Sequence, residues 1–222
     1  MTRATKLRGV VFDLDGTLID SLPLVLRSIA HAIEPYAPAR PTMEIFAHLG
    51  GPPRRFMPGL LGGEEHLAAA LVRMNDFHNA NEHSIEPFAQ MAASLATLRH
   101  RGVVLAIWTG RDRRSGEGLL RARGLAELFS TVVYGDDLPT HKPEPAGMKE
   151  ILRRLDLPAT DVVFVGDADV DVQGGVGAGV DTVLIRHSRP MDPAVCAQAW
   201  QTVDTPEEAF QLLLDLTPAN RE

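Results

Sequence analysis

Five short runs of apolar, mostly β-branched residues recur along this chain, and they constrain its fold more than any other feature. They span residues 9–13, 103–109, 131–134, 161–167 and 182–186. Between the later runs, apolar residues repeat with helical spacing over 113–125, 145–155 and 170–177. Strands buried on both faces appear as continuous apolar runs, and alternation with helices is typical of a covered parallel sheet. The pattern predicts an α/β fold with a doubly wound parallel sheet.

The 70 residues from 21 to 90 interrupt this alternation, because they contain helical spacing but no convincing strand. Their apolar residues form two helical faces, Leu22, Val25, Leu26, Ile29 and Ile33 in one, and Leu67, Leu71, Met74 and Phe77 in the other. An interval of this length exceeds an ordinary crossover. We therefore predict a catalytic α/β core formed by 1–20 and 91–222, with an inserted all-helical cap domain at 21–90.

Composition limits the partners of such a chain. The 222 residues are 45% hydrophobic, which is enough for a proper core, and they carry a net charge of −7 with only 5% aromatic residues. An acidic, aromatic-poor surface does not suit nucleic acid or anionic lipid, so we expect a small-molecule partner, with neither nucleic acid nor membrane as partner. The longest apolar run, 103–108, is far shorter than the roughly 20 residues of a membrane span.

The single cysteine, Cys196, cannot form an internal disulfide, and the first eight residues are basic with no long apolar stretch behind them. Both features favour a reducing, cytoplasmic location. The sequence leaves the oligomeric state open between monomer and homodimer.

Polar residues fall where the predicted strands end. Asp13 and Asp15 follow the first run, Thr109 ends the second, and Asp167 ends the fourth. Lys142 follows the third run after a loop. Ligands of open parallel sheets bind at the carboxyl ends of the strands, near the point where the strand order reverses. The sequence therefore predicts a functional site at this edge.

If Asp13 and Asp167 lie on neighbouring strands, their charges repel by about 4 kcal/mol at about 4 Å in an effective dielectric near 20. A divalent cation would remove this cost, and oxygen ligands favour Mg²⁺ over zinc. Asp171, two residues after Asp169, is either a further metal ligand or a first-turn helix carboxylate stabilised by the helix dipole.

Two further features of the sequence are suited to binding an anion. Lys142 precedes Pro143, which fixes the chain, and offers a positive charge there. Thr109 and Gly110 offer a hydroxyl and a backbone N–H before a helix, as an anion cradle or as an ordinary helix cap.

Together these segments resemble the four motifs of the haloacid dehalogenase superfamily of phosphotransferases, in the family's order. The motifs are Asp13-Leu14-Asp15-Gly16-Thr17-Leu18, Thr109, Lys142-Pro143, and Gly166-Asp167 with Asp171. The resemblance covers the predicted core, and the insert lies where the family has its helical cap. The loop at 50–55 resembles the specificity loop of phosphoglycolate-phosphatase-like members, although it is unusually basic.

The resemblance implies a role for each matching residue. Asp13 would be the nucleophile that forms an aspartyl-phosphate, and Asp15 the general acid and base. The implied Mg²⁺ ligands are Asp13, the backbone carbonyl of Asp15, and Asp167, with Asp171 nearby. Thr109, Gly110 and Lys142 would bind the phosphoryl oxygens.

Two arginines are candidate substrate contacts. Gly110 stands where many relatives have asparagine, so the missing contact is expected from the backbone or from Arg111. Arg54, beside Arg55 in the basic loop, is expected either to bind a second anionic group of the substrate or simply to face water.

The function expected from the resemblance is a Mg²⁺-dependent phosphatase acting on a small phosphate monoester, phosphoglycolate-like or a sugar phosphate. Two alternatives remain. One is a phosphosugar mutase similar to β-phosphoglucomutase, and the other is a non-catalytic sensor of phosphorylated ligands.

Overall fold

The computed structural model describes residues 7–48, 53–187 and 191–217. The chain divides into two compact units, the first formed by Met1–Asp20 with Glu86–Glu222 and the second by Ser21–Ile85. Within the described ranges, no helix has both the length and the apolar character needed to cross a membrane.

The first unit contains a six-stranded sheet in which every neighbouring pair is parallel. Its strands are β1 (Gly9–Phe12), β4 (Val104–Trp108), β5 (Thr131–Val133), β6 (Val162–Gly166), β7 (Asp181–Ile185) and β8 (Gln201–Val203). The spatial order is β5-β4-β1-β6-β7-β8. Along the chain, β4 and β5 are added on one side of β1, and β6, β7 and β8 are then added on its other side. The strand order therefore reverses at β1. The predicted doubly wound parallel sheet is confirmed.

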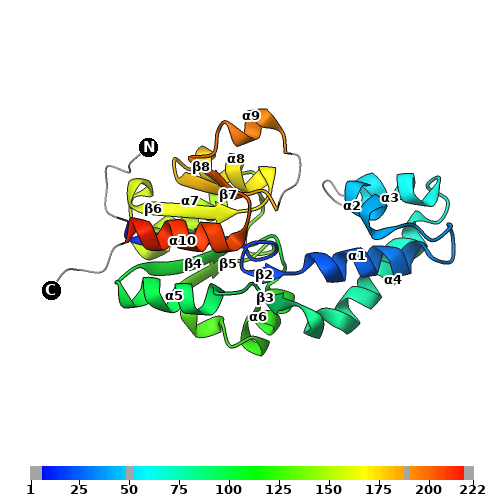
Figure 1. Ribbon diagram of the computed structural model, residues 1–222, viewed down its shortest axis with the longest axis horizontal. Coiled ribbons are helices and arrows are strands. Elements are labelled where there is room, and N and C mark those ends of the chain that lie inside the picture. The colour runs from blue at the N-terminus through cyan, green and yellow to red at the C-terminus, as the bar shows by residue number, and fades with distance from the viewer. Residues whose placement is uncertain (1–6, 49–52, 188–190, 218–222) are drawn as a thin grey trace. The chain divides into compact units, whose positions relative to one another are not determined.

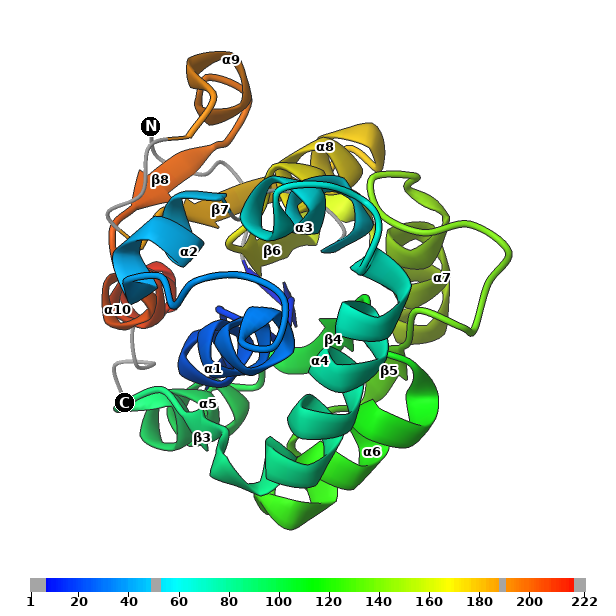
Figure 2. The same cartoon turned by 90° about the vertical axis from the view of Figure 1, so that its right-hand side faces the viewer.

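Helices cover both faces of this sheet. One face packs against α5 (Met91–His100) and α10 (Pro206–Leu216), and the other against α7 (Ala146–Leu155) and α8 (Asp169–Gly177). Figures 1 and 2 show the two pairs on opposite sides of the strands. The other helical elements described in this unit are α6 (Arg113–Ala122), α9 (Pro193–Cys196), and the 3-10 turns η2 (Ala126–Leu128) and η3 (Ala159–Asp161).

The sequence pattern did not predict a short two-stranded ribbon in the first unit. Here β2 (Ile19–Asp20) pairs antiparallel with β3 (Glu86–Pro87), and the Phe88 N–H donates to the Leu18 carbonyl at 3.0 Å. These bonds place residues 86–90 in the core unit, so the predicted boundary at residue 90 is five residues too late. Strand β8 was also missed, because its three residues are too few to show a period.

The second unit is helical in its described residues. It consists of α1 (Leu22–Ile33), α2 (Thr42–His48), α3 (Pro53–Leu61), α4 (Leu67–Asn81) and the 3-10 turn η1 (Glu82–Ser84). The two apolar faces identified in the sequence meet here, since Ile29 and Ile33 of α1 share a buried cluster with Leu71 of α4.

Close packing on the α8 face of the sheet depends on glycine. A methyl group on Gly174 would lie 2.7 Å from the Trp108 ring, and one on Gly175 would overlap the Thr182 hydroxyl. These two glycines therefore permit close helix–sheet packing. Trp108 is a core residue, only 4% exposed.

We expect Gly175→Ala to destabilise the protein by about 1–3 kcal/mol, because the added methyl cannot fit without moving β7. Gly118→Ala is the matched control: Gly118 is also helical, and no atom lies within 4 Å of its would-be methyl group. That variant should be stabilised by roughly 0.5–1 kcal/mol through helix propensity. Urea unfolding of both variants measures the difference, and equal effects would contradict the packing argument.

Candidate active site

The three central strands bring their following residues together at one edge of the sheet. Asp13 follows β1, Thr109 follows β4 and Asp167 follows β6, and β1 lies between β4 and β6. The Asp13 N–H continues the ladder by donating to the Val165 carbonyl at 2.8 Å. The carboxyl edge at the strand-order reversal therefore holds two carboxylates and a hydroxyl side by side.

Lys142 reaches this edge from the loop after β5. Its Nζ donates to Asp13 Oδ1 at 2.6 Å and to Asp171 Oδ1 at 2.7 Å. The Lys142 side chain is only 8% exposed, and its ammonium lies over the rings of Trp108 and Phe164 at 5.2 and 5.4 Å from their centroids. A buried cation thus bridges two carboxylates, one directly after β1 and the other in the first turn of α8.

Burial and charge act in opposite directions on this pair. Burial alone would lower the pKa of Lys142, but the Asp13 and Asp171 carboxylates outweigh it and raise that pKa above its usual value. Burial raises the pKa of Asp13 well above its usual value, Lys142 opposes this, and the nearby Asp171 and Asp167 carboxylates raise it further. Lys142 therefore stays protonated, whereas the surroundings of Asp13 disfavour its ionised form.

The side chains of Asp13, Asp167 and Asp171 each bring a carboxylate oxygen within 4.8 Å of the others. A set of hard oxygen donors of this kind fits Mg²⁺. Gly16 leaves space for the Asp167 carboxylate, because a side chain at position 16 would overlap that carboxylate. The φ of Gly16 is +76°, which also favours glycine at this position.

Asp171 combines two roles that the sequence left open. Its Oδ2 accepts the Ala168 N–H at 3.0 Å, which stabilises the start of α8, while its Oδ1 accepts from Lys142. It is also one of the three clustered carboxylates. The helix-start role and the site role are thus compatible.

The Asp15 side chain lies outside this cluster and faces Arg111. The Arg111 guanidinium donates through Nε to Asp15 Oδ2 at 2.6 Å and through Nη2 to Asp15 Oδ1 at 2.8 Å. The Arg111 backbone N–H donates to Thr109 Oγ1 at 3.1 Å. A hydroxyl that accepts this bond keeps its own hydrogen for donation to an anion.

A small pocket opens beside Thr109 and Lys142, also lined by Gly110, Tyr134 and Gly135. The Gly110 carbonyl lies so close to Gly135 that a side chain on Gly135 would overlap it. Glycine at 135 therefore allows the loop after β5 to run directly against the loop after β4.

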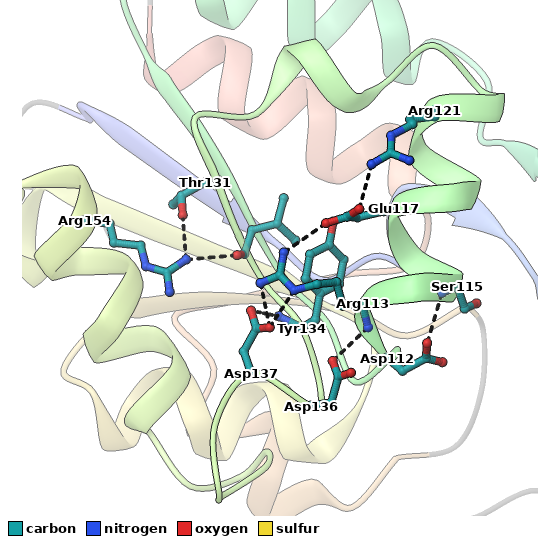
Figure 3. Close-up of polar contacts among 11 residues, drawn as sticks. Asp112, Arg113, Ser115, Glu117, Arg121, Thr131, Tyr134, Asp136, Asp137 and Arg154 are labelled. Carbon is teal, nitrogen blue, oxygen red and sulfur yellow. Dashed lines mark hydrogen bonds and ion pairs between the residues drawn. The ribbon is translucent and has the colours of Figure 1, made fainter.

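Figure 3 shows the polar network that fixes these two loops to each other. The Arg113 guanidinium donates to Asp137 Oδ1 at 2.7 Å and lies over the Tyr134 ring, 4.8 Å from its centroid. The Arg113 N–H donates to Asp136 Oδ1, and Asp112 begins α6 by accepting the Ser115 N–H at 3.0 Å. The network holds the start of the segment that delivers Lys142.

His187 is a site residue that the sequence analysis missed. Its Nε2 lies 2.6 Å from the Gly16 carbonyl oxygen, which can only accept, and 3.8 Å from Asp167 Oδ2. His187 follows β7, so the rule that polar residues after strands gather at the carboxyl edge would have included it.

The cap arginines belong to the other unit. Arg54 and Arg55 lie in α3, and both are exposed. Residues 50–52 of the predicted specificity loop lie outside the described residues.

The raised pKa of Asp13 predicts a stability effect. Since the folded protein holds this proton more tightly than the unfolded chain, ionised Asp13 destabilises the fold at neutral pH. In chelator, we expect Asp13→Asn to raise the melting temperature, by about 2–4 °C for each kcal/mol gained. Added Mg²⁺ should then stabilise the wild type more than the variant.

Asp215→Asn serves as the control, because Asp215 is exposed on α10 and, among the residues that the structure describes, its side chain accepts only from Gln211. Its melting temperature and its response to Mg²⁺ should match the wild type. A lower melting temperature of Asp13→Asn in chelator, or an equal Mg²⁺ response, would contradict the electrostatic argument.

Comparison with known proteins identifies the family. A family profile described as haloacid dehalogenase-like hydrolase matches residues 10–185. A phosphoglycolate phosphatase from Yersinia pseudotuberculosis is 33% identical over 227 residues, covering 99% of this chain and 95% of that protein. The pyrophosphatase PpaX of Halalkalibacterium halodurans is 30% identical over 188 residues, covering 82% of this chain and 85% of that protein.

Solved structures share the fold. A haloacid dehalogenase-like family protein from Streptococcus pneumoniae superposes with a TM-score of 0.77 at 18% identity, covering 93% of this chain and 98% of its own. A Thermotoga maritima protein provisionally assigned as a β-phosphoglucomutase gives 0.79 at 23% identity, covering 94% and 99%. The match over residues 10–185 and the relatives at 30% and 33% identity confirm the resemblance seen in the motifs, and the chain belongs to the haloacid dehalogenase-like hydrolase family.

Proposed function

We propose that the protein is a Mg²⁺-dependent phosphatase that hydrolyses a small phosphate monoester through a phosphorylated Asp13. The observation that carries this proposal is the buried Asp13 carboxylate, which Lys142 contacts at 2.6 Å and which lies beside Asp167 and Asp171. This arrangement combines a nucleophile, a fixed cation and an oxygen-rich cation site. The names of the curated relatives support phosphoryl chemistry. A cytoplasmic location is part of the proposal.

The side chains of Asp13, Asp167 and Asp171, with the backbone carbonyl of Asp15, would hold Mg²⁺. When bound, the ion supplies positive charge that draws the phosphoryl oxygens and offsets the repulsion among the carboxylates. Thr109, Gly110 and Lys142 would contact the phosphoryl oxygens through a hydroxyl, a backbone N–H and an ammonium.

In the first step, a carboxylate oxygen of Asp13 attacks phosphorus, and the ester P–O bond breaks as the new O–P bond forms. Asp15 gives its proton to the leaving oxygen, so that an alcohol departs. In the second step, Asp15 takes a proton from a water molecule whose oxygen attacks phosphorus. Inorganic phosphate leaves and the Asp13 carboxylate is restored.

A panel of phosphate compounds with excess Mg²⁺ tests this proposal. We include phosphoglycolate and pyrophosphate, which the names of the relatives suggest, together with hexose phosphates and 4-nitrophenyl phosphate. We expect release of inorganic phosphate from at least one of them. Asp13→Asn should abolish turnover, and Asp15→Asn should lower kcat by about 10²–10⁴.

The same panel separates the alternatives. A hexose phosphate that is converted to its isomer without release of free phosphate would show a mutase. Binding of phosphate without turnover of any compound would show a sensor. Full activity of Asp13→Asn would exclude the covalent route.

Selectivity is the proposed role of Arg54. If its guanidinium binds a second anionic group of the substrate, Arg54→Ala should raise KM for phosphoglycolate about tenfold and leave KM for 4-nitrophenyl phosphate nearly unchanged. Arg55→Ala, also exposed on α3, is the comparison variant. Equal KM changes for both substrates would remove this role from Arg54.

A further inference from the structure

The Arg111–Asp15 contact differs from the surface ion pairs of this protein. The Arg111 side chain is only 11% exposed and Asp15 is 34% exposed, whereas Arg153, paired with Glu150, is 71% exposed. The contact also joins residues 96 positions apart, and it uses both carboxylate oxygens. A bidentate pair of this kind fixes the plane of the carboxylate, which one hydrogen bond does not do.

Arg111 is itself held from two further directions. Its Nη1 donates to Ser115 Oγ at 3.0 Å, in the first turn of α6, and its backbone N–H donates to Thr109 Oγ1. Each of the three guanidinium nitrogens therefore already donates to a side chain of this chain. These bonds use three of the five guanidinium N–H groups within the chain, which favours a positioning role over the substrate contact expected for Arg111 from the sequence.

The two aspartates of the first motif thus have separate cations. Lys142 contacts Asp13, and Arg111 contacts Asp15. Because the two carboxylates are only two residues apart, separate partners keep their orientations independent. We propose that Arg111 is a positioning residue for Asp15: Arg111 orients the Asp15 carboxyl group, which gives its proton to the leaving oxygen, and Arg111 does not bind the substrate. This role rests on the proposed phosphatase function.

The positioning role predicts a dependence on the leaving group. Phenyl phosphate and 4-nitrophenyl phosphate are nearly equal in shape, but phenolate needs a proton when it leaves far more than 4-nitrophenolate does. Their kcat/KM values report every step up to departure of the alcohol. Substitution of a residue that binds the phosphoryl group would lower kcat/KM equally for both esters. Substitution of a residue that positions Asp15 would lower kcat/KM mainly for phenyl phosphate.

The experiment compares the wild type with Arg111→Ala on both esters in excess Mg²⁺. We expect kcat/KM to fall about 10- to 100-fold for phenyl phosphate and no more than about threefold for 4-nitrophenyl phosphate. Added guanidinium should restore part of the lost activity. Arg153→Ala, which removes one exposed arginine elsewhere, should have the same kcat/KM as the wild type for both esters.

A double-mutant cycle with Asp15→Asn completes the test. If Arg111 acts through Asp15, Arg111→Ala should cause no further loss of kcat/KM for phenyl phosphate in the Asp15→Asn background. Losses that multiply, or an equal fall for both esters, would overturn the positioning role and make Arg111 a substrate ligand. Circular dichroism confirms that each variant is folded, and Arg111→Lys replaces Arg111→Ala if the latter does not fold.

Failure of the proposed phosphatase function and failure of the positioning role give different results in this experiment. A wild type that hydrolyses neither ester, nor any compound of the panel, would overturn the phosphatase proposal and with it the role of Arg111. An active wild type whose Arg111→Ala variant has unchanged kcat/KM on both esters would overturn the positioning role alone.

Discussion

The crowding of carboxylates at the carboxyl edge of the central strands is the constraint on which the rest of the site depends. Asp13, Asp167 and Asp171 bring oxygens within 4.8 Å of one another, and two such charges repel by about 4 kcal/mol at about 4 Å in an effective dielectric near 20. The buried ammonium of Lys142 contacts two of the three and offsets part of this repulsion. A bound divalent cation would offset the rest.

Much of the surrounding structure delivers that ammonium and leaves room for the carboxylates. The network around Arg113 and Asp137 holds the loop after β5 against the start of α6. Gly16 and Gly166 lie where a side chain would overlap Asp167 and Asp171, respectively. Close packing of α8 on the sheet, which Gly175 allows, places Asp171 at the same edge.

Within this site, the two aspartates of the first motif have different surroundings. Asp13 is buried beside an ammonium, and burial raises its pKa. Asp15 is more exposed and accepts from a guanidinium through both of its oxygens. Two carboxylates with different partners are suited to different chemical tasks, which agrees with the proposed division between a nucleophile and an acid–base group.

Local pattern in the sequence was enough to predict the sheet, because strands buried on both faces leave continuous apolar runs. It was also enough to predict that Asp13, Thr109 and Asp167 follow strands at the carboxyl edge, although it missed His187. It missed β8 and the ribbon of β2 with β3, since two or three residues show no period. The late boundary at residue 90 has the same cause, because the ribbon that places residues 86–90 in the core left no signal.

The sequence by itself determined the family, the α/β class and the identity of the clustered acidic residues, because motif spacing and apolar runs are local properties of the chain. Only the tertiary structure decided that Arg111 pairs with Asp15 and that Lys142 also contacts Asp171. Lys142 lies 129 residues from Asp13, and Arg111 lies 96 residues from Asp15. Strand order and loop packing bring such distant groups within hydrogen-bond distance, and no local pattern encodes that choice of partner.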